Sequence, residues 1–202
     1  MIAIVDYGLG NLKSVACAFR RVGCEAIVTS EAKEIFAADG VVLPGVGAFE
    51  KAMENLNALG LADALRRIAG GEKPFLGICL GLQLLFERSR EHGLHDGLAV
   101  LRGEVVRFSA AMKVPHMGWN QVSIAKGSPL FDGVPDRSYF YFAHSYHVEP
   151  SDQSVILGRT DYGKPYVSAV SRGNTFGLQF HPEKSGRVGL QVIENFARLA
   201  RR

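Results

Sequence analysis

The residue best suited to carry chemistry is Cys79, in the run Lys73–Phe86. An apolar, strand-like stretch leads into the spacing Gly77-x-Cys79-x-Gly81, and a helix-like stretch follows it. This spacing is typical of a nucleophile on a sharp turn between a strand and a helix, where small neighbours relieve backbone crowding. Free N–H groups at the helix start would favour the thiolate and could hold an oxyanion. The alternative is a buried structural cysteine, because free cysteine is among the most buried residue types.

A cysteine nucleophile needs a base, and His181 is the candidate. It ends the strand-like run Thr175–Phe180 and is followed by Pro182 and Glu183. Since residues two apart at a strand end point the same way, Glu183 could accept the other ring N–H of His181 and fix its tautomer. A capped strand end with a surface glutamate explains the same residues. Cys79 needs a base, and the His181–Glu183 pair needs a nucleophile to act on. A Cys79, His181, Glu183 triad is therefore the leading hypothesis.

Two glycine-containing turns lie earlier in the chain. Gly8-Leu9-Gly10 does not indicate a dinucleotide site, because Lys13 stands where the third glycine of that fingerprint belongs. The loop 44–49 contains two glycines that would let backbone N–H groups face a ligand, as oxyanion donors do. A plain strand-to-helix turn explains the same residues and, without Cys79, would be the preferred interpretation.

The elements that must position these residues alternate in the first half. We expect strands over 2–5, 25–29 and 40–43, and helices over 12–22, from 30 or 31 to 38, and over 53–68 with a break near Gly60. This alternation predicts an α/β fold with a mostly parallel central sheet, flanking helices, and active groups at the carboxyl ends of strands. The second half predicts additional antiparallel or mixed strands over 98–101, 103–108, 120–124, 138–148, 155–160, 166–171 and 175–181, then a helix over 188–199.

Composition limits the function classes. The chain has 202 residues, 47% of them hydrophobic and 21% charged, which suits one domain over residues 1–202. A net charge of +3 with scattered Lys and Arg predicts no nucleic-acid partner. Because there is no signal pattern, and no apolar run near the roughly 20 residues that cross a bilayer, we expect a cytoplasmic protein without a membrane partner. Cys17 and Cys24 lack metal-ligand spacing, so we expect reduced structural cysteines and no metal site.

With these motifs in place, the chain resembles the class I, triad-type glutamine amidotransferases, and within them the family of glutaminase subunits of imidazole glycerol phosphate synthase. The resemblance runs from end to end. Segments 44–47, 77–83 and 181–183 look like motifs of the class, and segments 6–11, 116–120 and 141–146 look like motifs of the subunit family.

The resemblance implies a reaction without a cofactor. Cys79 would attack the side-chain amide of glutamine, His181 would protonate the departing ammonia and then activate water, and Glu183 would orient His181. The oxyanion would be held by N–H groups of Leu80 and of the loop at Val46 and Gly47, a loop that in the family reorients to complete the hole. The residues that match glutamine-binding positions are Gly45, Gly47, Gln83, Ser145 and Tyr146.

The chain shows no phosphate loop and no second constellation that could consume ammonia, so it needs a partner. The resemblance implies a heterodimer with a (β/α)₈ cyclase subunit that uses the ammonia in histidine biosynthesis. The residues that match interface positions of the family are Trp119, Tyr141 and Lys184. The sequence is equally consistent with a core aromatic at 119 and a solvated lysine at 184. His147 departs from the family, which more often has another aromatic residue there.

Three other functions remain open from the sequence. The first is another intracellular cysteine hydrolase, such as a peptidase or deglycase. The second is a different class I amidotransferase subunit. The third is a non-catalytic binding subunit that kept the fold.

Overall fold

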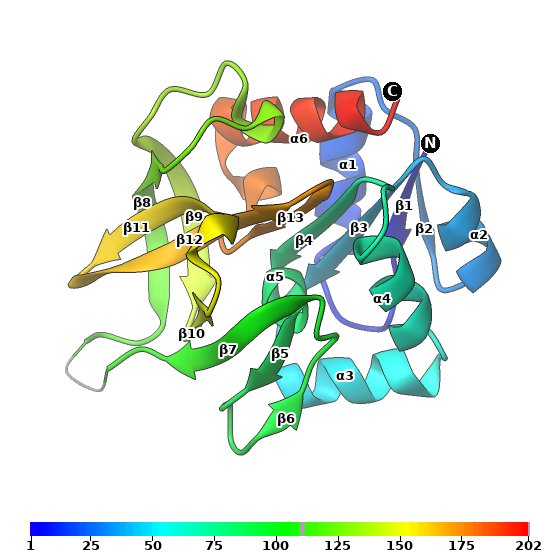
Figure 1. The fold of residues 1–202 in the computed structure, drawn as a ribbon. Helices are drawn as coiled ribbons and strands as arrows, with labels where there is room; N and C mark the ends of the chain where they lie inside the picture. The colour runs from blue at the N-terminus through cyan, green and yellow to red at the C-terminus, as the bar shows by residue number, and fades with distance from the viewer. Residues whose placement is uncertain (110–111, 202) are drawn as a thin grey trace.

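A computed structural model gives the fold of residues 1–109 and 112–201 (Figure 1). Strands and helices alternate from the N-terminus, as the spacing of apolar residues predicts. The elements of this half are β1 (Ile2–Val5), α1 (Leu12–Arg21), β2 (Ala26–Thr29), α2 (Ala32–Ala37), β3 (Gly40–Gly45), α3 (Phe49–Ala58), α4 (Ala62–Ala69), β4 (Phe75–Cys79) and α5 (Leu80–Leu84).

The parallel part of the sheet has the strand order β2-β1-β3-β4-β13, where β13 spans Thr175–Leu178. Neighbours in this part pair in parallel, and Gly45 of β3 lies opposite Cys79 of β4. Strand β13, from the far end of the chain, lies beside β4. The carboxyl ends of β3, β4 and β13 therefore meet at one edge of the sheet, which is where active groups collect in such folds.

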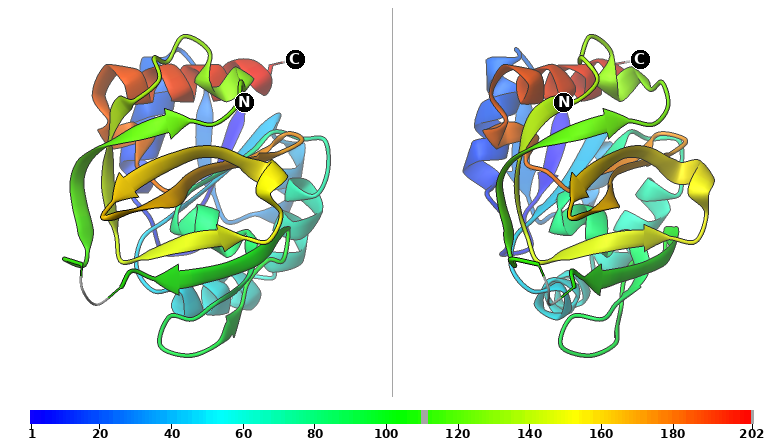
Figure 2. Two further views of the ribbon diagram at one scale, coloured as in Figure 1. Left: turned by 60° about the vertical axis from the view of Figure 1, so that its left-hand side comes forward. Right: turned by 90° about the vertical axis from the view of Figure 1, so that its left-hand side faces the viewer.

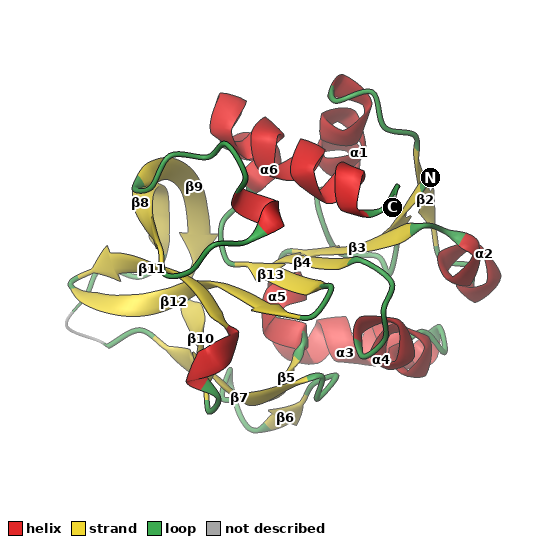
Figure 3. Cartoon of the chain, turned by 45° about the horizontal axis from the view of Figure 1, so that its top comes forward, coloured by secondary structure: helices red, strands yellow, loops and turns green. Residues whose placement is uncertain are grey.

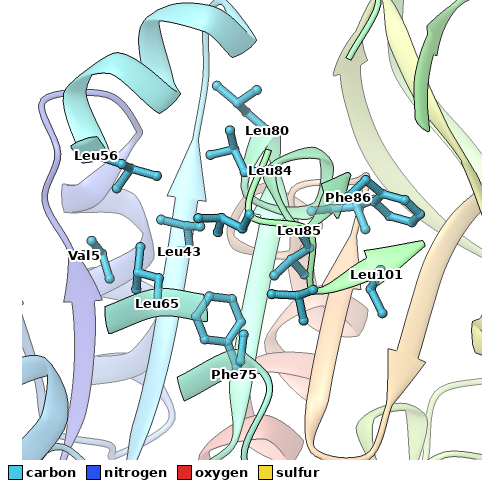
Figure 4. Packing of buried hydrophobic residues seen from close by; sticks show 14 of the residues in the cluster. Val5, Leu43, Leu56, Leu65, Phe75, Leu80, Leu84, Leu85, Phe86 and Leu101 are labelled. Carbon is cyan, nitrogen blue, oxygen red and sulfur yellow. The ribbon is translucent and has the colours of Figure 1, made fainter. Parts of the chain in front are cut away.

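Both faces of the parallel strands are covered by helices, so their side chains alternate between two cores (Figure 3). In β1, Ala3 and Val5 belong to one cluster with α3 and α4, and Ile2 and Ile4 belong to the other with α1 and α6 (Gly186–Leu199). Figure 4 shows the first cluster, in which Leu80 and Leu84 of α5 lie near Leu43 of β3. The nucleophile turn is thus anchored in the core.

The second half adds mainly antiparallel strands that curve away from the parallel ones (Figure 2). These strands are β7 (Leu101–Arg107), β8 (His116–Ile124), β9 (Ser138–His144), β10 (Tyr146–Pro150), β11 (Ile156–Tyr162) and β12 (Lys164–Arg172). Short 3₁₀ helices interrupt the chain at η1 (Pro129–Phe131), η2 (Gln153–Val155) and η3 (Pro182–Lys184). The predicted fold class is confirmed: a parallel sheet with flanking helices is extended by antiparallel strands.

Several predicted boundaries are wrong. The helix-like run after Cys79 ends at Leu84, and the chain continues as β5 (Phe86–Ser89) and β6 (His95–Asp96). A short, fully buried apolar run carries no periodicity that separates helix from strand. The expected strand 138–148 breaks at Ser145, because β9 pairs with β8 whereas β10 pairs with β7. Strand β13 ends at Leu178, before His181.

Within the described ranges, no helix combines the length and the apolar character that crossing a membrane requires.

Candidate active site

Cys79 is the last residue of β4 and directly precedes α5. Its backbone lies at φ 54° and ψ −106°, in a region that residues with a side chain rarely adopt. The flanking glycines allow this turn. A Cβ atom on Gly81 would collide with the backbone carbonyl of Leu43, and one on Gly77 would collide with the backbone of Gly81. The Gly-x-Cys-x-Gly spacing is therefore a steric requirement of the turn.

His181 and Glu183 form a buried pair beside this turn. The distance from His181 Nδ1 to Glu183 Oε1 is 2.9 Å, and their side chains are 3% and 1% exposed. Burial alone would lower the pKa of His181, but hydrogen bonds to Cys79 and Glu183 and the charges of both groups raise it to about 10. The imidazolium form is thus favoured next to the sulfur. The three predicted triad residues lie together.

Hydrogen bonds around His181 hold its backbone in place. Its N–H donates to the carbonyl of Tyr141 at 2.9 Å. The hydroxyl of Ser185 donates to the His181 carbonyl at 2.6 Å and accepts the N–H of Tyr141 at 3.0 Å. Strand β9 therefore fixes the segment that carries the base.

A cavity of about 240 Å³ opens at Cys79. Most of the residues predicted for the oxyanion hole and for substrate binding line it: Val46, Gly47, Leu80, Gln83, Ser145 and Tyr146. Gly45 does not line the cavity: it is buried, and a Cβ atom there would collide with the Tyr7 hydroxyl and with Leu80. That hydroxyl donates to the Pro44 carbonyl at 2.8 Å. Burial, with the charge at Cys79, raises the pKa of Tyr7, so it remains a neutral donor below the loop.

The structure adds two polar residues that the sequence analysis did not single out. Gln179 is fully buried, and its Nε2 lies 3.8 Å from Cys79 Sγ. Glu91 lines the cavity and accepts the N–H of Phe49 at 2.7 Å. Because Gln179 precedes His181 by two residues, strand alternation could have placed both on one side. No signal in the sequence pointed to Glu91.

A second hydrogen-bonded group borders the cavity. His144 Nδ1 lies 2.8 Å from the carbonyl of Tyr146, which can only accept, so this nitrogen carries the proton. Its Nε2 then accepts from Tyr166 at 3.2 Å or from His116 at 3.3 Å. Burial lowers the pKa of His144 to about 3 and that of His116 to about 4, so both are neutral at physiological pH. Buried His147 contacts Phe108, with ring centroids 4.7 Å apart.

No three His, Cys, Asp or Glu side chains are grouped as metal ligands among residues 1–109 and 112–201.

The residues predicted for a partner interface share one surface. Trp119 is 56% exposed, which rules out the alternative of a core aromatic. It lies opposite Tyr141 in the pairing of β8 and β9, with ring centroids 6.1 Å apart. The ammonium of Lys184 lies 5.8 Å from the centroid of the Tyr141 ring. Met117 and Tyr139 are also exposed on these strands, at 65% and 56%.

This arrangement suits acyl transfer from a small polar molecule. A thiolate held by an imidazolium can attack a carbonyl carbon, and the same imidazolium can protonate a leaving nitrogen. The size of the cavity favours a compact substrate over an extended chain.

Known proteins are similar to this chain in sequence or in fold. The family model for "Glutamine amidotransferase class-I" matches residues 3–199. The chain is 54% identical to the imidazole glycerol phosphate synthase subunit HisH of Moorella thermoacetica, covering 99% of this chain and 95% of that one. It is 50% identical to HisH of Aquifex aeolicus, covering 98% and 96%. It is 48% identical to HisH of Methanocaldococcus jannaschii, covering 98% and 100%.

Solved structures agree at the level of the fold. A crystal structure described as a glutamine amidotransferase superposes with a TM-score of 0.79 at 18% identity, covering 100% of both chains. A chain of PurLQS from Thermotoga maritima superposes with a TM-score of 0.75 at 17% identity, covering 98% of this chain and 97% of that one.

Proposed function

Because the chain belongs to the class I glutamine amidotransferases, we propose that it is the glutaminase subunit of an imidazole glycerol phosphate synthase. It hydrolyses the side-chain amide of glutamine to glutamate and ammonia. The observation that carries this proposal is the strained turn at Cys79 beside the buried His181–Glu183 pair. The identity of 54% to a HisH subunit over 99% of the chain supports the choice within the class.

The first half of the reaction forms a thioester. Cys79 attacks the amide carbon of glutamine, and the carbonyl oxygen takes the negative charge. His181 gives its proton to the amide nitrogen, the C–N bond breaks and ammonia leaves. The raised pKa of His181 suits this step, because the proton is present at neutral pH when the nitrogen needs it.

The second half uses the imidazole as a base. Neutral His181 takes a proton from water, the hydroxide adds to the thioester carbon, and Cys79 leaves as a thiolate, which yields glutamate. Glu183 accepts the Nδ1 proton of His181 at 2.9 Å throughout, so that Nε2 faces the reacting atoms.

The oxyanion is held by the N–H of Leu80 and by the loop at Val46 and Gly47. Leu80 is the first residue of α5, and the loop follows Gly45, which lies opposite Cys79 in the sheet. Losing one such donor typically lowers the rate by about 100- to 1000-fold.

The rest of the cavity suits the amino-acid part of glutamine. Gln83, Ser145 and Tyr146 line it with polar groups, and Glu91 supplies a carboxylate that suits an α-ammonium group. Gly47 lines the cavity and lets the backbone approach the ligand closely, whereas Gly45 packs against Tyr7 and Leu80 behind it.

Ammonia must reach a second active site before water protonates it. We therefore infer a heterodimer with the (β/α)₈ cyclase subunit of the synthase, in the cytoplasm. The surface of Met117, Trp119, Tyr139, Tyr141 and Lys184 suits that role, because exposed apolar and aromatic side chains gather on it.

The test is glutamine hydrolysis by the purified chain mixed with the barrel subunit. We expect release of glutamate and ammonia, and loss of both in Cys79→Ala, whereas synthesis from added ammonium by that variant complex continues. Hydrolysis of peptides without glutaminase activity would contradict the proposal and favour another cysteine hydrolase. If glutamine still drives turnover in Cys79→Ala, Cys79 is not the nucleophile.

A further inference from the structure

We propose that Gln179 donates a hydrogen bond from its side-chain amide to Cys79 Sγ, and so stabilises the thiolate and fixes its position. This inference rests on the proposed role of Cys79 as the nucleophile. It adds a polar group to the site that neither the triad nor the oxyanion hole includes.

The position of Gln179 suits this contact. It follows β13 directly, and β13 pairs in parallel with β4, which ends at Cys79. The backbone N–H of Gln179 donates to the carbonyl of Ser168 at 2.9 Å, so the main chain is fixed. His181 lies two residues further on, and the side chains of both residues contact the sulfur.

Neighbouring hydrogen bonds decide which end of the Gln179 amide faces the sulfur. The carbonyl of Tyr146 can only accept, and Gln83 Nε2 lies 3.0 Å from it. The same Nε2 lies 3.2 Å from the side chain of Gln179, which must present its oxygen, Oε1. The Nε2 of Gln179 is then the end that lies 3.8 Å from Cys79 Sγ. The amide therefore donates to the sulfur.

The free-energy cost of burying the Gln179 amide favours a functional role for its contact with Cys79. A fully buried amide loses its hydration and needs partners for both ends. A hydrogen bond to a charged acceptor is stronger than one between neutral groups, so the contact stabilises the thiolate more than the thiol. The same bond stabilises the sulfur when it leaves the thioester.

The experiment measures alkylation of Cys79 by iodoacetamide against pH, read on the Cys79 peptide by mass spectrometry. Gln179→Met removes the donor at similar length without adding a charge, and we expect the midpoint of the alkylation profile to rise by about one pH unit. Gln179→Glu keeps an acceptor for Gln83, and its carboxylate beside the sulfur should raise the midpoint further, because like charges repel. Gln153→Glu, at an exposed glutamine, is the matched control and should leave the midpoint unchanged.

An unchanged midpoint in a folded Gln179→Met variant would overturn the proposal, because it would show that the Gln179 amide does not stabilise the thiolate. If both variants fail to fold, a comparison of the full-length wild-type chain with Cys79→Ala by NMR decides. The assigned side-chain amide protons of Gln179 should shift in Cys79→Ala, and their failure to move would equally overturn the proposal. Neither measurement uses glutamine, so a missing glutaminase activity would count only against the proposed function.

Discussion

Two features prepare the nucleophile: the strained backbone at Cys79 and the charge at His181. A positive φ at a residue with a side chain typically costs about 1–3 kcal/mol, and it turns the cysteine out of the strand direction. The helix that follows is only five residues long, so its dipole is smaller than the sequence suggests. The imidazolium of His181, whose pKa is raised to about 10, is therefore the positive charge beside the sulfur.

The variant Glu183→Gln tests the contribution of the charge at His181. The carboxylate helps to raise the pKa of His181 to about 10, so the imidazolium, and the stability it contributes, is present at low pH and is lost as pH rises through that value. In the variant this pKa falls, and the alkaline limb of kcat/KM should move to lower pH. We expect glutaminase activity about 100-fold below wild type, a smaller loss than in Cys79→Ala.

Steady-state rates between pH 6 and 10, measured with the barrel subunit present, check this prediction. Glu194→Gln, at a partly exposed glutamate of α6 that pairs with Arg198, is the control for loss of a carboxylate. Activity equal to wild type in Glu183→Gln would remove this residue from the mechanism.

Among the elements, the sequence predicted those with clear periodicity and missed those decided by tertiary pairing. Strand β1 and helix α1 follow the expected ranges because the spacing of their apolar residues fits only one kind of element. Strand β5 begins at Phe86 because that residue pairs with Leu101, and no local sequence pattern predicts this pairing. Glu91 could not be found for the same reason, since the residues that make it part of the site lie far away in sequence, whereas the spacing of Gln179 to His181 was a usable signal.

Gly81→Ala tests whether the turn between β4 and α5 tolerates a side chain. The added Cβ would meet the backbone carbonyl of Leu43, which cannot move aside as a flexible side chain can. We expect the free energy of unfolding to fall by about 3 kcal/mol, as in overpacked cores. Urea denaturation measures this change. Gly127→Ala is the matched control, because nothing lies within 4 Å of its added Cβ; equal stability of the two variants would show that the turn has room.

Across the whole molecule, the site joins distant parts of one chain. Cys79 comes from its middle and His181 from near its end, and the pairing of β4 with β13 brings them together. The same region meets the exposed surface on β8 and β9, because Lys184 follows Glu183 directly and its ammonium lies over Tyr141. The proposed docking surface therefore adjoins the triad on the side of η3.

Trp119→Ala tests that surface. The side chain is 56% exposed, so its removal should leave the free energy of unfolding of the isolated chain nearly unchanged. If the barrel subunit covers it, binding should weaken by about 2 kcal/mol, or roughly 30-fold in Kd, as for a central aromatic of an interface. Calorimetric titration of the barrel subunit measures this change. Phe36→Ala, at another exposed aromatic on α2, should bind as the wild type does. Equal loss of affinity in both variants would indicate a general effect on the fold, and unchanged affinity in Trp119→Ala would place the partner on a different surface.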